Sequence, residues 1–289
     1  IHHNKKMARN LLSACASGLV RETRQLTNTR GLASSAQSTP VLRYFESRGR
    51  AQALRYALTD STVDFVDEKI SFQHVASGNW MNMKHNERIS GPFGMLPVLQ
   101  WGPACVAQTE AIAGYLYTRL GHGGQSTDPV AAAERAAASA ALTSLAHQDL
   151  IGMCIQLVGV MATFHGKASD ADLAGPANQC YARINAILPR LESMLARRDA
   201  GAGGPPGGFL GPEPVMGDYF MYEALDMAML VVGPSILVPF ENLGVFHAWM
   251  SLRPRIAAYL SSGRRPLTMT GNPAEAEAIK RIRASLNTA

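Results

Sequence analysis

The sequence is sparing with charged and aromatic residues, and it lacks a long uninterrupted apolar run. Charged residues make up 17% and aromatic residues 7% of the 289 residues, and mean hydropathy is −0.02. The best apolar stretch, 151–164, is interrupted by Gln156 and Gly159 and is shorter than the ~20 residues that cross a bilayer. No membrane span is therefore predicted, and the composition is that of an ordinary globular chain.

Cysteine is also scarce, and its spacing excludes two kinds of site. None of the four cysteines forms a Cys-x-x-Cys pair, so neither a zinc site nor a disulfide framework is predicted. We expect no bound metal. Cys154 and Cys180 lie among apolar helical residues and are most simply small buried hydrophobic side chains.

Acidic residues are almost missing from the N-terminus. The first 32 residues hold six basic residues against Glu22 alone, which accounts for the whole net charge of +5. The remainder is neutral overall, so no nucleic-acid partner is predicted. Residues 1–40, rich in Arg and Ser, are typical of an organellar transit peptide. The segment 30–35 resembles a mitochondrial processing site with cleavage near Leu32. Two alternatives stay open: a plastid or cytoplasmic location, and a disordered basic N-terminal arm that carries no targeting signal.

Strand and helix patterns alternate over residues 41–121. Apolar and β-branched runs predict strands, and 3.6-residue periodicity predicts helices. The predicted strands are 41–45, 63–70, 96–101 and 105–107, the predicted helices are 48–59 and 109–120, and 71–90 is a polar loop with a short irregular helix. This order predicts a small open sheet with helices packed on it.

Beyond a linker at 122–128, every predicted element is helical. The predicted helices are 131–164, 180–198, 215–232, 243–252 and 254–261, with Pro189 expected to kink or restart the second of them. We therefore expect an α/β domain over 41–121, an all-α domain over 129–265 and a C-terminal tail over 266–289.

Several motifs occur in an order that resembles one family. They are the run 44–52 (Tyr-Phe-Glu-Ser-Arg-Gly-Arg-Ala-Gln), Trp80 followed by Lys84, the run 93–99 (Phe-Gly-Met-Leu-Pro-Val-Leu), the run 108–112 (Gln-Thr-Glu-Ala-Ile), and later 209–211, 217–219 and 253–260. Together they resemble the cytosolic glutathione transferase superfamily over about residues 41–265. Within this superfamily the motifs most resemble the sigma class, which includes glutathione-dependent prostaglandin D synthases. The resemblance implies a thioredoxin-like first domain followed by a helical bundle.

The resemblance assigns thiol activation to Tyr44 and Arg50. A thiol with a pKa near ~8.5 is mostly protonated at neutral pH, and only the thiolate is a good nucleophile. A hydrogen bond from the Tyr44 hydroxyl to the sulfur would favour the charged form, and Arg50 would add positive potential. Without the motif, Tyr44 would be a packing residue and Arg50 a surface cation.

The resemblance assigns the remaining glutathione contacts to two further groups. Leu96, before a Pro97 expected to be cis, would pair its backbone with the cysteinyl part, whereas a trans proline would only end an edge strand. Gln108 and Thr109, at a helix N-terminus that favours anions, would bind the γ-glutamyl group, although Thr109 could equally be an ordinary N-cap. The glycine carboxylate would meet Trp80 and Lys84, which by themselves are a surface pair.

Asp149 resembles the acid that reaches the γ-glutamyl amine of a second subunit, so a homodimer is expected; an exposed helical aspartate explains the same residue. The acceptor would be a small hydrophobic electrophile or a peroxide. By position it would lie near Phe45, Ser47, Met153, Cys154 and Leu157. The resemblance thus implies a glutathione transferase with glutathione as co-substrate, whose reaction could be conjugation, peroxide reduction or isomerisation.

Two other functions stay open at this point. One is a non-catalytic, transferase-like structural or accessory subunit of a larger mitochondrial assembly. The other, a thiol-disulfide oxidoreductase on the same scaffold, would need a cysteine where Tyr44 or Ser47 stands, and neither position has one.

Overall fold

A four-stranded mixed sheet occupies the first part of the chain. The computed structural model describes residues 38–124, 127–163, 169–202 and 206–286, so the predicted transit peptide lies almost entirely outside the described residues. The spatial strand order is β2-β1-β3-β4, with β1 parallel to β2 and antiparallel to β3, and β3 antiparallel to β4. The strands are β1 (Val41–Phe45), β2 (Val66–Ile70), β3 (Val98–Trp101) and β4 (Ala104–Ala107).

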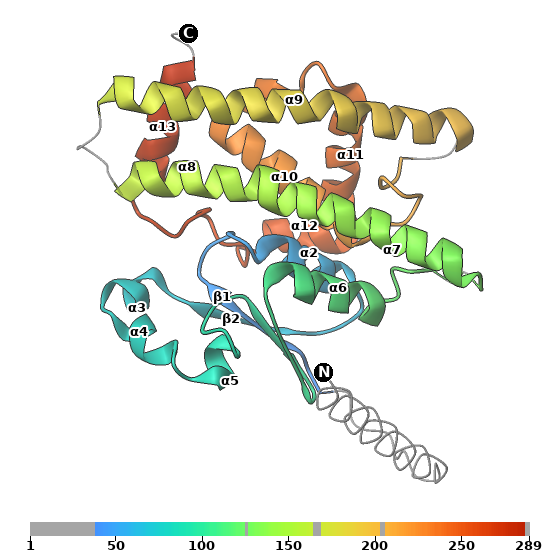
Figure 1. Ribbon diagram of the computed structural model, residues 1–289, viewed down its shortest axis with the longest axis horizontal. Helices are drawn as coiled ribbons and strands as arrows, with labels where there is room; N and C mark the ends of the chain where they lie inside the picture. The colour runs from blue at the N-terminus through green and yellow to red at the C-terminus, as the bar shows by residue number, and fades with distance from the viewer. Residues whose placement is uncertain (1–37, 125–126, 164–168, 203–205, 287–289) are drawn as a thin grey trace, which may run out of the picture. The chain divides into compact units, whose positions relative to one another are not determined.

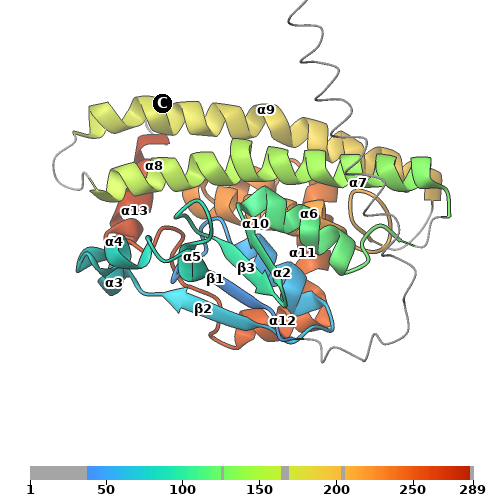
Figure 2. The ribbon, with the colours of Figure 1, turned by 60° about the horizontal axis from the view of Figure 1, so that its bottom comes forward.

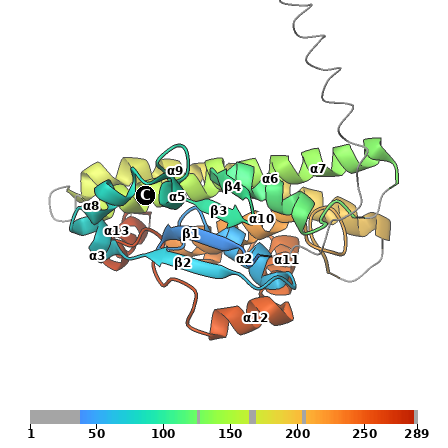
Figure 3. The same cartoon turned by 90° about the horizontal axis from the view of Figure 1, so that it is seen from below.

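Two helices cover the face of the sheet that lies toward the helical half of the chain. They are α2 (Gln52–Asp60) and α6 (Thr109–Arg119), and Figure 1 shows both between the strands and the long helices. Seven consecutive residues of α2, from Gln52 to Leu58, are buried. Figure 3 shows the strands from below, in the frame of Figure 1. The predicted order of strands and of the two flanking helices is confirmed. However, α2 begins four residues later than predicted, and β2 begins three residues later.

Three short helices replace the predicted polar loop between β2 and β3. Each begins at a residue that supplies a cap or a left-handed backbone: Ser71 and Asn86 accept backbone N–H groups through their side chains, and Gly78 has φ +78°. These helices are α3 (Phe72–Ala76), α4 (Asn79–Met83) and α5 (Glu87–Ser90).

The first long helix of the second half changes its hydrogen-bonding pattern in the middle. It begins at Pro129, two residues earlier than predicted, behind an Asp128 side chain that accepts the Val130 N–H at 2.9 Å. It runs as α7 (Pro129–Ser144), a π-helical segment η1 (Leu145–Ile151) and α8 (Gly152–Thr163). By length and composition, Pro129–Thr163 could cross a membrane, but half of its apolar window is buried inside the structure. Buried core helices meet the same criterion.

The next helix, α9 (Asp170–Ala202), begins ten residues earlier than predicted. Pro176 and Pro189 both lie inside it without ending it. The apolar residues on its buried side explain its continuity, since Ile184, Leu188, Leu191 and Leu195 are almost completely buried and tertiary packing offsets the lost backbone hydrogen bonds. The expectation that Pro189 restarts the helix is therefore wrong. Figure 2 shows α9 running beside α7 and α8.

The centre of the helical half is α10 (Met216–Val232), whose side chains are almost all buried. It contacts α2, α6, α7, η1 and α8, and it therefore joins the sheet domain to the bundle. The remaining elements are the 3₁₀ turn η2 (Pro234–Leu237), α11 (Glu241–Leu252), α12 (Pro254–Ser261) and α13 (Glu275–Leu286).

The predicted C-terminal tail contains α13, which is part of the core. Ile279 and Ile282 are buried, and the helix contacts α8, α9 and α10. Its apolar positions recur at the spacing of an amphipathic helix, which is the signal that could have predicted it.

Asp218 holds the start of α10. Its carboxylate accepts the Phe209 and Val215 N–H groups, each at 2.7 Å, and the residue is completely buried. Val215, the residue before the helix, has no side-chain acceptor, so only the carboxylate half of a capping box is present. Burial raises the pKa of Asp218 to about 6.

We expect Asp218→Asn to lower the free energy of unfolding by about 2 kcal/mol, because one buried N–H then faces a donor instead of an acceptor. Urea denaturation of the chain lacking residues 1–38 measures the change. Glu213→Gln, at an exposed carboxylate close by in the sequence (side chain 81% exposed), is the matched control and should shift stability by less than about 0.5 kcal/mol. Equal stability of the two variants would contradict this role of Asp218.

Candidate active site

The phenol of Tyr44 lies at the point where β1 turns into α2. Its hydroxyl oxygen accepts the Arg50 backbone N–H at 3.1 Å, and the side chain is buried, with 7% exposed. The ring passes close to Gly49, which has φ +42°; a Cβ atom there would lie 2.5 Å from the Tyr44 hydroxyl. The turn therefore needs glycine both for its backbone angle and for the close approach of the ring.

Burial keeps this phenol protonated. It raises the pKa of Tyr44 above the ordinary value of 10, while the Arg50 N–H and the nearby Arg50 and Arg55 charges offset only part of the rise. Because the hydroxyl accepts one hydrogen bond and stays neutral, its own O–H remains able to donate. The arrangement suits a donor to an anion.

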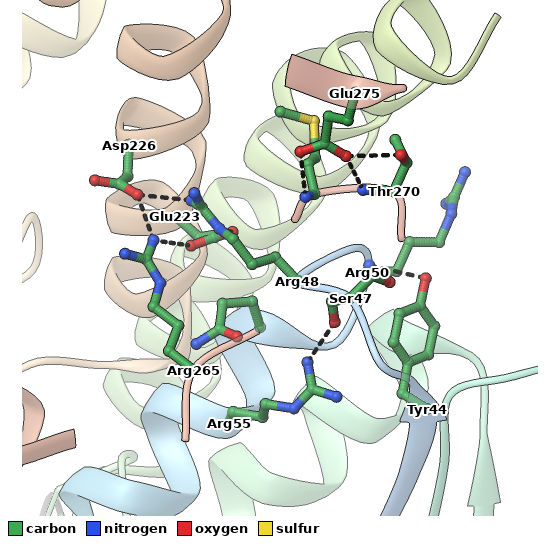
Figure 4. Close-up of polar contacts among 12 residues, drawn as sticks. Tyr44, Ser47, Arg48, Arg50, Arg55, Glu223, Asp226, Arg265, Thr270 and Glu275 are labelled. Atoms are coloured by element: carbon green, nitrogen blue, oxygen red, sulfur yellow. Dashed lines mark hydrogen bonds and ion pairs between the residues drawn. The ribbon is translucent and has the colours of Figure 1, made fainter. Parts of the chain in front are cut away.

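The Arg50 side chain takes a course that the sequence does not predict. Its guanidinium extends away from the phenol (Figure 4) and donates to His147 Nε2 at 3.1 Å. The other ring nitrogen of His147 lies 3.1 Å from Glu110 Oε1. An always-protonated guanidinium needs an unprotonated nitrogen as acceptor, so His147 is neutral with its hydrogen on Nδ1. Burial, together with the Arg50 charge, lowers the pKa of His147, in agreement with that tautomer.

His147 owes its position to the π-helical segment η1. Such segments widen a helix by one residue per turn and occur frequently at functional sites. Here η1 places His147 and Gln148 against Glu110 of α6, with Gln148 Nε2 2.8 Å from the same carboxylate oxygen. Neither the π-helix nor the role of Glu110 is visible in the sequence, although a His-Gln-Asp run inside an apolar helix is the available signal.

Two turns opposite Tyr44 offer backbone groups. The Leu96–Pro97 bond is cis, as expected. Gln108 has φ +76° and is the only non-glycine residue with positive φ in the described part of the chain. Such a conformation is costly and concentrates at functional sites. No Gln108 side-chain cap covers the N-terminus of α6, and Thr109, buried, is its first helical residue. Thr109 is thus not the N-cap.

Trp80 lies in α4, and Lys84 follows directly at its C-terminal end. The Trp80 ring stands edge-on to Phe45, with centroids 5.2 Å apart. Lys84 lies alongside Gly94: a Cβ atom there would be 3.3 Å from the Lys84 carbonyl oxygen and 3.7 Å from two carbons of its side chain. The contact brings Lys84 next to the turn that contains Pro97.

Asp149 and the expected acceptor residues are spread over different surfaces. Asp149 forms an ion pair with Arg183 of α9 and shares a hollow of about 520 Å³ with Arg50. Cys154 is fully buried in the helical core. Met153 and Leu157 face a groove between α8 and α9. An acceptor near Cys154 is therefore not accommodated, because the helix turns this side chain into the core, and the other four residues do not line one common pocket.

Phe45 borders a smaller cavity, and Ser47 packs beside it. The cavity of about 150 Å³ is formed by β1, α3 and the segment before α13, with Phe72 and Gly271 in its wall. A Cβ atom at Gly271 would be 3.6 Å from both Phe72 and Ser47. The chain before α13 thus closes the side of the site on which an acceptor was expected.

A group of buried charges supports the turn from the side of the bundle. Figure 4 shows Arg48 and Arg265 converging on Glu223 and Asp226 of α10. Arg48 donates to Glu223 at 2.9 Å and to Asp226 at 2.6 Å, and Arg265 pairs with Asp226. The sequence does carry a signal for this cluster, since Glu223 and Asp226 are two acids three residues apart in the middle of a helix that is mostly apolar.

Known proteins resemble the chain in sequence and in fold. A family model described as "Glutathione S-transferase, C-terminal domain" matches residues 165–263. A "Glutathione S-transferase" of Dirofilaria immitis is 25% identical over 222 residues, covering 75% of this chain and 90% of that protein. The chain is a distant homologue of the glutathione S-transferases. Its sheet domain is accordingly the thioredoxin-like domain of a glutathione S-transferase fold.

Solved structures of this fold do not distinguish a class. The Pi-class glutathione S-transferase of Onchocerca volvulus aligns with a TM-score of 0.58 at 22% identity, over 81% of this chain and 99% of that one. The prostaglandin synthase D of Nilaparvata lugens aligns with a TM-score of 0.54 at 17% identity, over 78% and 98%. Assignment of this glutathione S-transferase homologue to the sigma class stays a prediction.

We expect Gly49→Ala to destabilise the protein by about 3 kcal/mol, the sum of a left-handed backbone cost of about 1–2 kcal/mol and overpacking against Tyr44 of about 1–3 kcal/mol. Urea denaturation gives the value. Gly78→Ala is the matched control, since Gly78 has φ +78° but a Cβ atom there would meet nothing within 4 Å. Its free energy of unfolding should fall only by the left-handed backbone cost of about 1–2 kcal/mol. If both variants lose the same free energy, the Tyr44 ring does not depend on Gly49.

Proposed function

We propose that the chain is a glutathione transferase that ionises the glutathione thiol through Tyr44. The observation that carries the proposal is a buried, protonated phenol whose oxygen already accepts the Arg50 N–H. Donation from that phenol to a sulfur stabilises the thiolate and lowers the thiol pKa. The thiolate then forms a bond from sulfur to an electrophilic carbon and displaces a leaving group such as chloride. In peroxide reduction it attacks a peroxide oxygen, the O–O bond breaks to release an alcohol after protonation, and a second glutathione reduces the resulting sulfenic acid to give glutathione disulfide and water.

The surrounding turns supply groups suited to the rest of the tripeptide. The uncapped N-terminus of α6 at Thr109 has free N–H groups and the positive end of the helix dipole, which favour a carboxylate. Leu96, before the cis bond, offers backbone groups for the cysteinyl part, and Lys84 next to the same turn offers a cation for the glycine carboxylate. Homology to glutathione S-transferases supports glutathione as the co-substrate.

We expect Tyr44→Phe to lower kcat for conjugation of chlorodinitrobenzene by about a hundredfold, because the sulfur loses its hydrogen-bond donor, a loss of the size seen when one anion-stabilising donor is removed. The affinity for glutathione should change by less than about threefold, since Phe keeps the ring packing. Steady-state kinetics and titration calorimetry measure the two quantities.

Tyr181→Phe, at a tyrosine on α9 whose side chain is 41% exposed, is the matched control and should leave both quantities unchanged. A wild-type protein that binds glutathione without any thiolate absorbance would favour the non-catalytic accessory subunit. A wild-type protein that does not bind glutathione would refute the proposal.

We also propose that a second copy of the chain completes the site through Asp149. Asp149 lies on η1, partly exposed, beside Arg183 and in the hollow that Arg50 borders. From that surface a carboxylate can reach an ammonium group bound by another copy. The pairing with Arg183 orients the side chain without neutralising all of its acceptor sites.

We expect Asp149→Asn to raise KM for glutathione about tenfold and to leave kcat within about twofold, because the lost charge contacts the bound amine and not the sulfur. Asp64→Asn, at an exposed aspartate before β2, is the control. Analytical ultracentrifugation of the wild type should show a dimer. A fully active monomer would overturn the dimeric site.

A further inference from the structure

The segment 264–274, which joins α12 to α13, crosses the turn that presents Tyr44. Two of its carbonyl oxygens accept backbone hydrogen bonds from that turn: Thr268 accepts the Arg48 N–H at 2.8 Å, and Met269 accepts the Gly49 N–H at 2.9 Å. Met269 is completely buried. Figure 1 shows this segment passing below α8 on its way to α13. We call it the C-terminal strap.

The strap is fixed at its far end by Glu275, the first residue of α13. The buried Glu275 carboxylate accepts the Met269 N–H at 2.6 Å and the Thr270 N–H at 2.7 Å. It also accepts the Thr270 hydroxyl at 2.7 Å. Three hydrogen bonds to one carboxylate hold the strap in a single course where it meets the turn (Figure 4).

The near end is fixed by Arg265 in the buried charge cluster. Arg265 pairs with Asp226 and lies 3.7 Å from Glu223, and Arg48 of the turn binds the same two acids. Two guanidinium groups face two carboxylates in this cluster, and His247 lies 3.4 Å from the other carboxylate oxygen of Asp226. Removing Arg265 leaves Arg48 as the one arginine of the described residues that binds both Glu223 and Asp226, and so changes the balance of attraction on the Arg48 side chain.

The turn itself has little freedom once these contacts are made. Arg55 of α2 donates to the Ser47 carbonyl at 2.8 Å and to the Phe45 carbonyl at 3.3 Å, which supports the turn from the other side. Arg48 and Gly49 are the two residues directly before Arg50, whose N–H meets the phenol. Their orientation therefore sets the direction of the Arg50 N–H.

We propose that Arg265 is a positioning residue for thiol activation: through the C-terminal strap and Arg48 it holds the turn so that the Arg50 N–H meets the Tyr44 hydroxyl. The inference rests on the proposed function for its kinetic consequence only. The effect on the turn itself can be measured without glutathione.

The test compares Arg265→Met with Arg264→Met. Arg264 is the adjacent, exposed arginine, whose side chain bonds Ser262 and lies over the Tyr259 ring, outside the cluster. In the Arg265 variant we expect the pKa of bound glutathione, followed by ultraviolet thiolate absorbance, to rise by about one unit, and kcat to fall about tenfold. KM for glutathione should stay within about twofold. Arg265→Lys should restore part of the loss, and Arg264→Met should match the wild type.

Hydrogen exchange read by mass spectrometry gives a second, glutathione-free measurement. The Arg48 and Gly49 amides should be protected in the wild type and should exchange at least about tenfold faster in Arg265→Met, in line with the loss of a fixed local structure. Thermal melting checks that the variant is folded. If it is not, Glu275→Gln loosens the other end of the strap and should give the same two shifts.

Thiol activation by Tyr44 and the positioning role of Arg265 are contradicted by different results. A wild type that binds glutathione without ionising its thiol refutes thiol activation, while the exchange measurement still decides the role of the strap. A wild type that ionises glutathione, combined with folded Arg265→Met and Glu275→Gln variants whose thiol pKa and exchange rates are unchanged, overturns the positioning role. Unprotected Arg48 and Gly49 amides in the wild type overturn it as well.

Discussion

One hydrogen bond, from the Arg50 N–H to the Tyr44 hydroxyl, is the contact on which the site depends. It exists because Gly49 allows the chain to turn back against the aromatic ring at a distance that a Cβ atom would prevent. It occupies one lone pair of a buried phenol and leaves the O–H hydrogen to point elsewhere. Every other feature of the site either holds this turn or surrounds the place where that hydrogen can be donated.

The turn is held by charged side chains together with backbone hydrogen bonds to the C-terminal strap. Buried ion pairs contribute little net stability compared with apolar packing, because desolvation offsets the Coulomb attraction. Here the charged groups orient the backbone, because Arg48, Arg55 and Arg265 each bind one defined partner. The same logic applies to His147, whose tautomer is set by Arg50 on one side and Glu110 on the other.

Much of the architecture follows from local patterns. Strand alternation and helical periodicity predict the order of most elements, and the resemblance of the run 93–99 implies the cis bond before Pro97. The errors arise where tertiary contacts outweigh local preference. Pro189 stays inside α9 because one side of that helix is buried, and α13 forms because its apolar face finds a bundle.

The site shows the same limit. Sequence motifs identify a set of six residues: Tyr44, Trp80, Lys84, Leu96, Pro97 and Thr109. In the structure Trp80 packs against Phe45, next to Tyr44, and Lys84 lies beside the turn that contains Pro97. Their roles in binding glutathione stay a prediction. No local pattern could pair Arg48 with Glu223 or Arg265, because these residues are far apart in the chain and their attraction arises only when both are buried. The π-helix at His147 likewise packs against α10, a contact between segments far apart in the chain.

The C-terminal strap also bears on when the site can form. The turn around Tyr44 is synthesised well before Thr268, Met269 and Glu275. A nascent chain can build its sheet domain before these residues exist, but the acceptors for the Arg48 and Gly49 amides arrive only after the helices up to α12 have been made. A chain that stops before the C-terminal strap would therefore carry Tyr44 without the contacts that hold its turn.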